Sequence, residues 1–202
     1  MPLISIQQLA DDVRIGLWQM TEKPAELYAQ HPYLQPFAAE IDTRYKSEAR
    51  KQEFLCVRAL LHAMCPHETP VISHEPDGKP VLSNGWQLSI SHTKGYAVLI
   101  LSEHRTVGID IEYMSDRVNR IAPKYIRPDE CAPAVTDKLL NWSAKETAYK
   151  YYSEDNLQYF DMRVTAQQAF LHVENLKRSA VLKVLYRVEP DYVLTYAYEE
   201  LP

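Results

Sequence analysis

Alternating and periodic apolar residues predict several short strands and two long helices. Apolar and polar residues alternate over Trp86–Ser91 and Thr106–Tyr113, which is typical of strands, and the continuously apolar run Tyr96–Leu101 predicts a buried strand. Apolar residues at helical spacing predict a helix over Glu48–Met64. A second stretch, Asp137–Tyr152, is free of Gly and Pro and predicts another helix. This mixture indicates the α+β class.

The order of these elements repeats along the chain. The other expected elements are an opening strand at Val13–Met20, a hairpin loop at Thr93–Gly95, and closing strands at Val181–Val188 and Tyr192–Tyr198. When the chain is divided near residue 104, each half has an opening strand, a helix and then a hairpin. We therefore predict two α/β halves related by a pseudo-two-fold axis, residues 1–104 and 105–202. Each half is expected to be a small, mostly antiparallel sheet with a packed long helix.

Composition and charge exclude several classes of protein. The formal net charge is −5, whereas a generic nucleic-acid binder normally has a basic excess. No apolar run approaches the roughly 18 residues that a membrane span needs. The first residues lack a basic region followed by an apolar stretch, so no signal peptide is expected. We therefore expect a cytoplasmic protein that binds neither membranes nor nucleic acids.

Three carboxylates are the strongest chemical signal. In the strand Val107–Tyr113 the side chains of Gly108, Asp110 and Glu112 face the same way, with the two carboxylates about 7 Å apart. Gly108 is expected to leave space there for a ligand. In the second helix Glu146 and Lys150 lie one turn apart. If Glu146 approaches the strand carboxylates, their mutual repulsion requires a cation, and oxygen ligands suit Mg²⁺.

Two further features allow more than one interpretation. His92, at the end of a strand, is suited to hydrogen-bond phosphate oxygens or to cap a loop. Lys51, Arg58 and His62 share one face of the first helix, which by itself is typical of a solvated surface.

The motifs in their order resemble the 4′-phosphopantetheinyl transferases, closest to the two-halved, single-chain Sfp type. The segments that carry the resemblance are Gly78-Lys79-Pro80, Ile90-Ser91-His92, Val107–Glu112, and Trp142–Glu146 with Lys150. The resemblance implies a holo-[acyl-carrier-protein] synthase, whose active site lies between the halves. Such an enzyme transfers the phosphopantetheine arm of coenzyme A to a serine of an acyl or peptidyl carrier protein and releases adenosine 3′,5′-bisphosphate. Its cofactor would be Mg²⁺, with Mn²⁺ as a possible substitute.

The resemblance also implies roles for individual residues. Asp110, Glu112 and Glu146 would be the metal ligands or their close neighbours. The expected coenzyme A contacts are Arg50, Lys51 and Arg58 at the 3′-phosphate, Lys79, Pro80 and Ser91 around the nucleotide, and His92, Lys150 and the nearby Lys145 at the pyrophosphate. His92, Glu146 and Lys150 are thus expected to take part in catalysis.

The general base and the docking surface are predicted from one segment. Ile121–Glu130 resembles a family segment that ends in a proposed catalytic glutamate, which makes Glu130 the candidate base; the alternative is that Glu130 only opens a short helix. Arg117–Arg127 contains four basic residues and no acidic one, and could form an amphipathic helix with Val118, Ile121 and Tyr125 as apolar anchors. We expect acidic carrier proteins to dock there on a monomeric enzyme.

Two other functions remain open from the sequence. A metal-dependent phosphohydrolase acting on pyrophosphate bonds could use the same three carboxylates. A degenerate copy could bind coenzyme A or a carrier protein without catalysing transfer, although the intact set of Asp110, Glu112, Glu146 and Lys150 argues against it.

Overall fold

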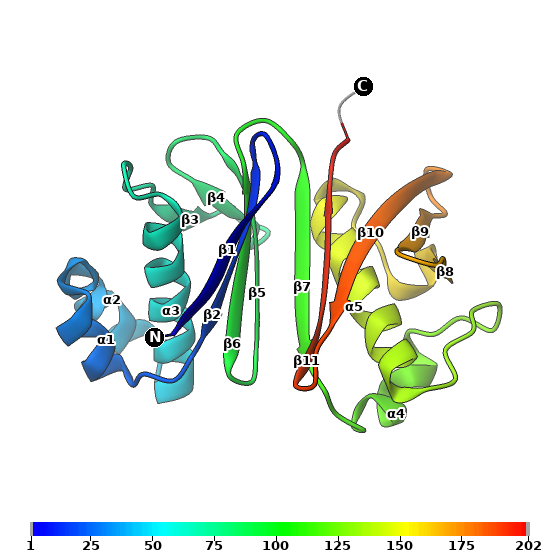
Figure 1. Ribbon diagram of the computed structural model, residues 1–202, viewed down its shortest axis with the longest axis horizontal. Helices are drawn as coiled ribbons and strands as arrows, with labels where there is room; N and C mark the ends of the chain where they lie inside the picture. Colours follow the sequence, from blue (N-terminus) through cyan, green and yellow to red (C-terminus); the bar gives the residue numbers. More distant parts are fainter. Residues whose placement is uncertain (1, 201–202) are drawn as a thin grey trace.

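The computed structural model describes residues 2–200 and contains two antiparallel sheets, each with a long helix packed on it (Figure 1). One sheet has the strand order β1-β2-β6-β5, and the other has the order β7-β11-β10-β9-β8. A small third sheet pairs β3 with β4. This arrangement confirms the predicted α+β class with two sheet-and-helix halves.

The elements are as follows. The first part of the chain forms β1 (Leu3–Ala10), β2 (Val13–Gln19), α1 (Pro24–Gln30), the 3-10 helix η1 (Pro32–Phe37), α2 (Ala38–Arg44), α3 (Glu48–Met64), β3 (Ile72–His74), β4 (Pro80–Leu82), β5 (Gln87–Thr93) and β6 (Tyr96–Ser102). The second part forms β7 (Val107–Tyr113), α4 (Val118–Ile121), η2 (Ala122–Lys124), α5 (Val135–Tyr151), η3 (Ser153–Asp155), η4 (Tyr159–Asp161), β8 (Met162–Ala166), β9 (Leu171–Asn175), β10 (Ala180–Val188) and β11 (Tyr192–Tyr198).

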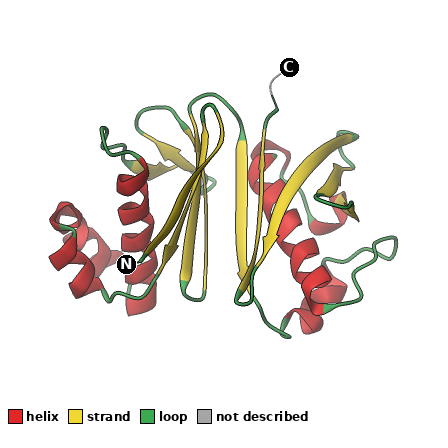
Figure 2. Ribbon diagram, in the orientation of Figure 1, coloured by secondary structure: helices red, strands yellow, loops and turns green. Residues whose placement is uncertain are grey.

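The two halves repeat one connectivity. In the first half the opening strand β2 pairs with β6, which pairs with β5, and the long helix α3 lies between β2 and that hairpin in the chain. In the second half β7 pairs with β11, which pairs with β10, and α5 holds the same position. Figure 2 shows the two long helices on the outer sides of the two sheets. The repeat supports the predicted division near residue 104, which remains our proposal.

Small residues allow each long helix to approach its sheet. A Cβ atom on Gly16 in β2 would lie 2.5 Å from Met64 Sδ of α3, and one on Gly108 in β7 would lie 2.5 Å from the carbonyl oxygen of Thr147 in α5. Ala144 of α5 is fully buried in the same packing. The expectation that Gly108 leaves space for a ligand is therefore wrong, because the backbone of α5 fills that space.

Several elements differ from the sequence prediction. Strand β1 was not predicted because its polar run Gln7-Gln8 breaks the alternation, and because it is an edge strand in which Ile4 and Ile6 are exposed. Strands β8 and β9, of five residues each, were also missed. Thr93 continues β5, so the following turn is only Lys94-Gly95, with Gly95 at φ +84°.

A shared core and a row of hydroxyl groups join the halves. Apolar side chains of β2 and β6 pack against those of β7 and β11 in one cluster. Strands β5 and β7 lie side by side without a backbone ladder between them. Instead, the backbone N–H of Ile109 donates to Ser89 Oγ (3.1 Å) and that of Tyr113 donates to Thr93 Oγ1 (3.1 Å). Among residues 2–200, no helix has both the length and the apolar character that crossing a membrane requires.

Candidate active site

Asp110 lies at the centre of a buried polar cluster between β7, β5 and α5. Its Oδ1 accepts hydrogen bonds from Ser91 Oγ (2.8 Å) and Lys150 Nζ (2.8 Å), and its Oδ2 accepts one from Ser143 Oγ (2.9 Å). Lys150 also donates to the carbonyl oxygen of Ile109 (2.9 Å). The close packing of α5 on Gly108 is what brings the helix side chains to this carboxylate.

The other two predicted carboxylates lie on the same side of β7. Glu112 Oε1 accepts a hydrogen bond from Trp142 Nε1 (2.8 Å), and Glu146 Oε1 accepts one from the hydroxyl of Tyr159 (2.9 Å). Burial, the negative charge of Asp110 and, more weakly, that of Glu146 raise the pKa of Glu112 to about 7, against the lowering effect of Trp142. Burial and the charge of Asp110 also raise the pKa of Glu146. The three carboxylates are therefore close enough to repel one another.

The chemistry of these donors fits a hard divalent cation. All are carboxylate oxygens, which hard divalent cations prefer, and burial together with the charges of Asp110 and Glu146 raises the pKa of Glu112. Within residues 2–200 no three His, Cys, Asp or Glu side chains are gathered closely enough to hold a metal ion as they stand. Each carboxylate instead accepts at least one hydrogen bond from a hydroxyl, indole or ammonium group.

A cavity of about 890 Å³ opens beside this cluster, between the two halves. It brings together five of the predicted coenzyme A contacts, namely Lys79, Pro80, Ser91, His92 and Lys150. It is also lined by His74, Tyr149 and Tyr151, which are not among the predicted site residues. Burial is the main cause that lowers the pKa of His92, while the nearby Glu53 opposes the shift (Nδ1 to Oε1, 3.7 Å).

Comparison with known families shows what the second half of the chain is similar to. Residues 106–197 match the family model of the 4′-phosphopantetheinyl transferase superfamily. This stretch of the chain is therefore similar to that superfamily. The matched region runs from the residue before β7 into β11, so it includes Asp110, Glu112, Glu146 and Lys150, whereas Lys79, Ser91 and His92 precede it. A search of curated proteins found no match for the chain.

The basic side chains of α3 differ in whether they form ion pairs. None of Arg50, Lys51 and Arg58 lines the cavity. Lys51 forms ion pairs with Asp42 (2.7 Å) and Glu48 (3.2 Å), and Arg50 forms one with Glu53 (2.9 Å).

Arg58 has a different environment from its two neighbours. Its guanidinium lies over the ring of Phe54, 3.2 Å from the ring centre, and donates to the carbonyl oxygen of that residue. Burial lowers the pKa of Arg58 to about 10, and within residues 2–200 the guanidinium has no carboxylate at ion-pair distance. Arg58 is therefore a partly desolvated cation, and the charge of Glu40, which is not at ion-pair distance, opposes the shift only in part.

Glu130 and Lys145 form a buried ion pair away from the cavity. Lys145 Nζ donates to Glu130 Oε2 (2.9 Å) and to the carbonyl oxygen of Tyr125 (2.6 Å), and both charged side chains have 0% exposure. Glu130 also accepts hydrogen bonds from the backbone N–H groups of Arg127 (2.7 Å) and Val164 (2.6 Å).

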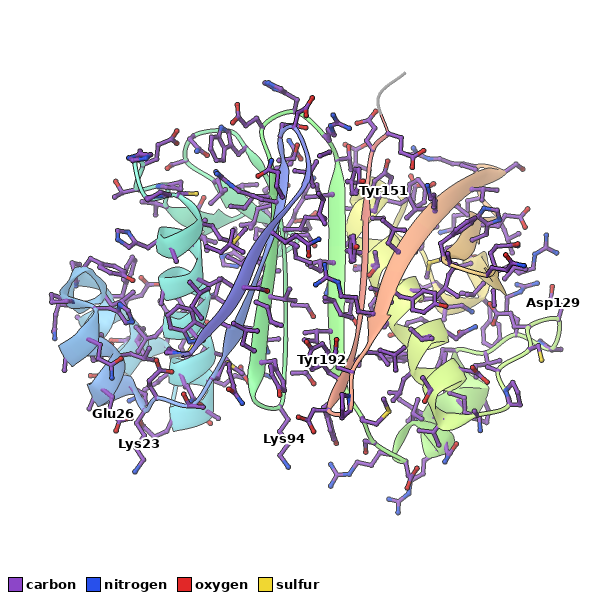
Figure 3. All side chains as sticks on the ribbon, viewed as in Figure 1. Lys23, Glu26, Lys94, Asp129, Tyr151 and Tyr192 are labelled. Atoms are coloured by element: carbon purple, nitrogen blue, oxygen red, sulfur yellow. The ribbon has the colours of Figure 1, made fainter. Side chains whose placement is uncertain are left out.

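This pair changes the interpretation of both residues. Glu130 does not begin a helix, and neither side chain faces the cavity. Figure 3 shows the neighbouring Asp129 at the outer rim of the second half, well away from Tyr151 at the cavity. This geometry gives no support to a base role for Glu130 or to a pyrophosphate contact by Lys145.

The structure also shows contacts that the sequence did not reveal. Ser143 lies within the motif Trp142–Glu146, but the sequence does not predict its hydrogen bond to Asp110, because that contact depends on the packing of α5 on β7. Tyr159 gave no signal at all, because it follows a loop and reaches Glu146 across a separation of 13 residues.

Proposed function

We propose that this protein is an Sfp-type enzyme that transfers the 4′-phosphopantetheine arm of coenzyme A to a serine of an acyl or peptidyl carrier protein. The observation that carries the proposal is the double role of Lys150, which lines the cavity and also contacts Asp110 at the acidic cluster. The pyrophosphate linkage of coenzyme A, bound in the cavity, would thereby contact the Lys150 ammonium, which in turn contacts Asp110 of the acidic cluster. The match to the transferase superfamily over residues 106–197 supports this assignment.

The proposed reaction is a substitution at phosphorus. The carrier serine oxygen forms a bond to the phosphorus that bears the pantetheine arm, and the serine loses its proton. The bond from that phosphorus to the bridging oxygen breaks, and adenosine 3′,5′-bisphosphate leaves. Lys150 and His92 would contact the pyrophosphate, since both line the cavity next to Asp110.

Asp110, Glu112 and Glu146 are the proposed ligands of Mg²⁺, and Mn²⁺ is the proposed substitute because it also prefers oxygen donors. When these three carboxylates hold a divalent cation, it would supply positive charge that stabilises the leaving phosphate. Lys79 and Pro80 would line the nucleotide site in the cavity. A monomeric state and a cytoplasmic location are part of the same proposal.

For the 3′-phosphate we propose Arg58 in preference to Lys51. Lys51 forms ion pairs with two carboxylates, whereas Arg58 is desolvated and forms no ion pair within residues 2–200. Burial and the charges of Arg44 and Arg58 lower the pKa of His74, which lines the cavity, so these cations lie near its wall. A phosphate would supply the missing negative charge.

The proposed carrier-docking surface is smaller than the sequence predicted. The segment forms only one turn of α4 followed by η2, and Val118 and Tyr125 are buried in the protein's own core. They are therefore not docking anchors. Ile121 remains exposed among the exposed cations Arg117, Arg120 and Lys124. We propose that an acidic carrier protein binds this reduced surface, where charge complementarity would assist encounter.

One assay tests the proposal against its alternatives. The protein is incubated with coenzyme A, Mg²⁺ and an apo carrier protein, and the intact carrier is weighed by mass spectrometry. A gain of one phosphopantetheine group supports transfer. Hydrolysed coenzyme A with an unmodified carrier would indicate a phosphohydrolase, and bound but unchanged coenzyme A would indicate a non-catalytic binder.

A further inference from the structure

Two aromatic side chains donate hydrogen bonds to two of the proposed metal ligands. Trp142 Nε1 donates to Glu112 Oε1 (2.8 Å), and the hydroxyl of Tyr159 donates to Glu146 Oε1 (2.9 Å). Within residues 2–200 no hydrogen bond engages Oε2 of either carboxylate. Each donor thus fixes one oxygen and leaves the other for a cation.

The two donors form a single packed unit. The rings of Trp142 and Tyr159 lie 5.0 Å apart at an angle of 34°. The fully buried ring of Tyr125 meets Trp142 edge-on at 4.9 Å and lies 6.4 Å from Tyr159. Contacts of this kind restrain the orientation of each ring, and therefore of its N–H or O–H group.

The turn that carries Tyr159 is itself fixed. Asn156 adopts a left-handed conformation (φ +46°) that ends the segment after α5, and Leu157 is buried with 3% exposure. Asp161 accepts a hydrogen bond from the backbone N–H of Gln158 (2.8 Å) and forms an ion pair with Lys177 (3.1 Å). The hydroxyl of Tyr159 is thus held toward Glu146 by restraints on both sides.

We propose that Tyr159 is a positioning residue, which together with Trp142 orients Glu146 and Glu112 for a divalent cation. This inference rests on the proposed function. A carboxylate with one oxygen held by a rigid donor loses less rotational freedom when its other oxygen binds a metal. Residues that contact metal ligands in this way typically contribute about 10–100-fold to metal affinity or activity.

The test compares Tyr159→Phe with Tyr186→Phe. The first variant keeps the aromatic packing and removes only the hydroxyl group. Tyr186, in β10, packs against the same apolar cluster as Tyr159 and belongs to no part of the proposed site, so it is the matched control. Binding of Mn²⁺ to the protein without substrate is measured from the electron paramagnetic resonance signal of free Mn²⁺. Transfer is then measured as a function of Mg²⁺ concentration.

We expect Tyr159→Phe to bind Mn²⁺ about 10–100-fold more weakly and to need more Mg²⁺ for half-maximal activity, with most of kcat recovered at saturating Mg²⁺. Tyr186→Phe should match the wild type in both measurements. An unchanged Mn²⁺ affinity in Tyr159→Phe, with or without a lower melting temperature, would overturn the inference and leave Tyr159 a purely structural role. If the wild-type protein binds Mn²⁺ but transfers nothing, the proposed function fails, while the affinity comparison still decides the role of Tyr159.

Discussion

Replacing Glu130 by Gln should lower the thermal stability of the protein without removing a catalytic group. The Glu130 carboxylate accepts hydrogen bonds from Lys145, from the backbone of Arg127 and from the backbone of Val164. A glutamine offers one acceptor oxygen and one N–H₂ group, so at least one of these three donors would face another donor. Lys145, with 0% exposure, would also lose its counter-ion.

The size of the effect follows from the burial of the pair. Removing one partner of a buried ion pair costs about 3–5 kcal/mol. In a domain of about 200 residues each kcal/mol shifts the melting temperature by roughly 2–4 °C, so the expected decrease is about 6–20 °C. Glu200, whose ion pair with Lys183 (2.8 Å) is exposed, provides the matched control. Glu200→Gln should change stability by about 1 kcal/mol or less.

The assay combines thermal unfolding with transfer kinetics below the melting transition. Lys145→Met should also destabilise, and the double variant should cost less than the sum of the two single changes, because paired groups are coupled. A general base typically contributes about 10²–10⁴ to the rate. If Glu130→Gln lost that much kcat while its melting temperature stayed at the wild-type value, the structural interpretation of Glu130 would be refuted.

Three other changes test separate parts of the site. Gly108→Ala should cost about 1–3 kcal/mol by forcing α5 away from β7, and should weaken Mn²⁺ binding; calorimetry and metal titration check both effects. Asp110→Ala and Glu146→Ala should each abolish transfer while the circular dichroism spectrum stays folded, and full activity in both at saturating Mg²⁺ would contradict the metal assignment. Arg58→Met should reduce the preference for coenzyme A over 3′-dephospho-coenzyme A by about tenfold or more, the loss expected for a charge-assisted hydrogen bond. Lys51→Met should leave that preference unchanged, and the reverse order would assign the 3′-phosphate to Lys51.

The docking surface can be tested by charge reversal. Arg117 and Arg120 are changed together to Glu, and the apparent KM for the carrier protein is measured at saturating coenzyme A. A higher KM with little change in kcat is expected, since surface charges mainly affect encounter. An unchanged KM would exclude this surface as the docking site.

The elements that the sequence predicted well are those determined by local pattern. Helix α3 spans the predicted range, Glu48–Met64, and its buried apolar residues begin at Phe54. Strand β7 follows the alternation of Val107–Tyr113. Asp110 and Glu112 on one face of this strand contact α5, the helix that also carries Glu146. Each of these features depends on neighbours in the chain, which a pattern records.

The features that escaped prediction depend on partners far along the chain. The sequence around Glu130 identifies a carboxylate, but it does not predict that this carboxylate contacts Lys145. The burial of Lys145 depends on the packing of three segments that are separate in the sequence. Gly108 has the same sequence signature whether a ligand or a helix backbone fills the space above it. Tyr159 reaches Glu146 because the loop after α5 folds back toward that helix, and hydrophobic periodicity does not predict the path of a loop.

The row of hydroxyl groups between β5 and β7 has a consequence for solubility. Each of these strands is the edge of its own sheet, and a bare edge offers its unpaired N–H and C=O groups to other chains. Ser89 and Thr93 occupy N–H groups of β7 without merging the two sheets into one. A half produced alone would therefore expose an apolar edge strand, and we expect it to aggregate, so covalent linkage of the halves also protects the protein from self-association.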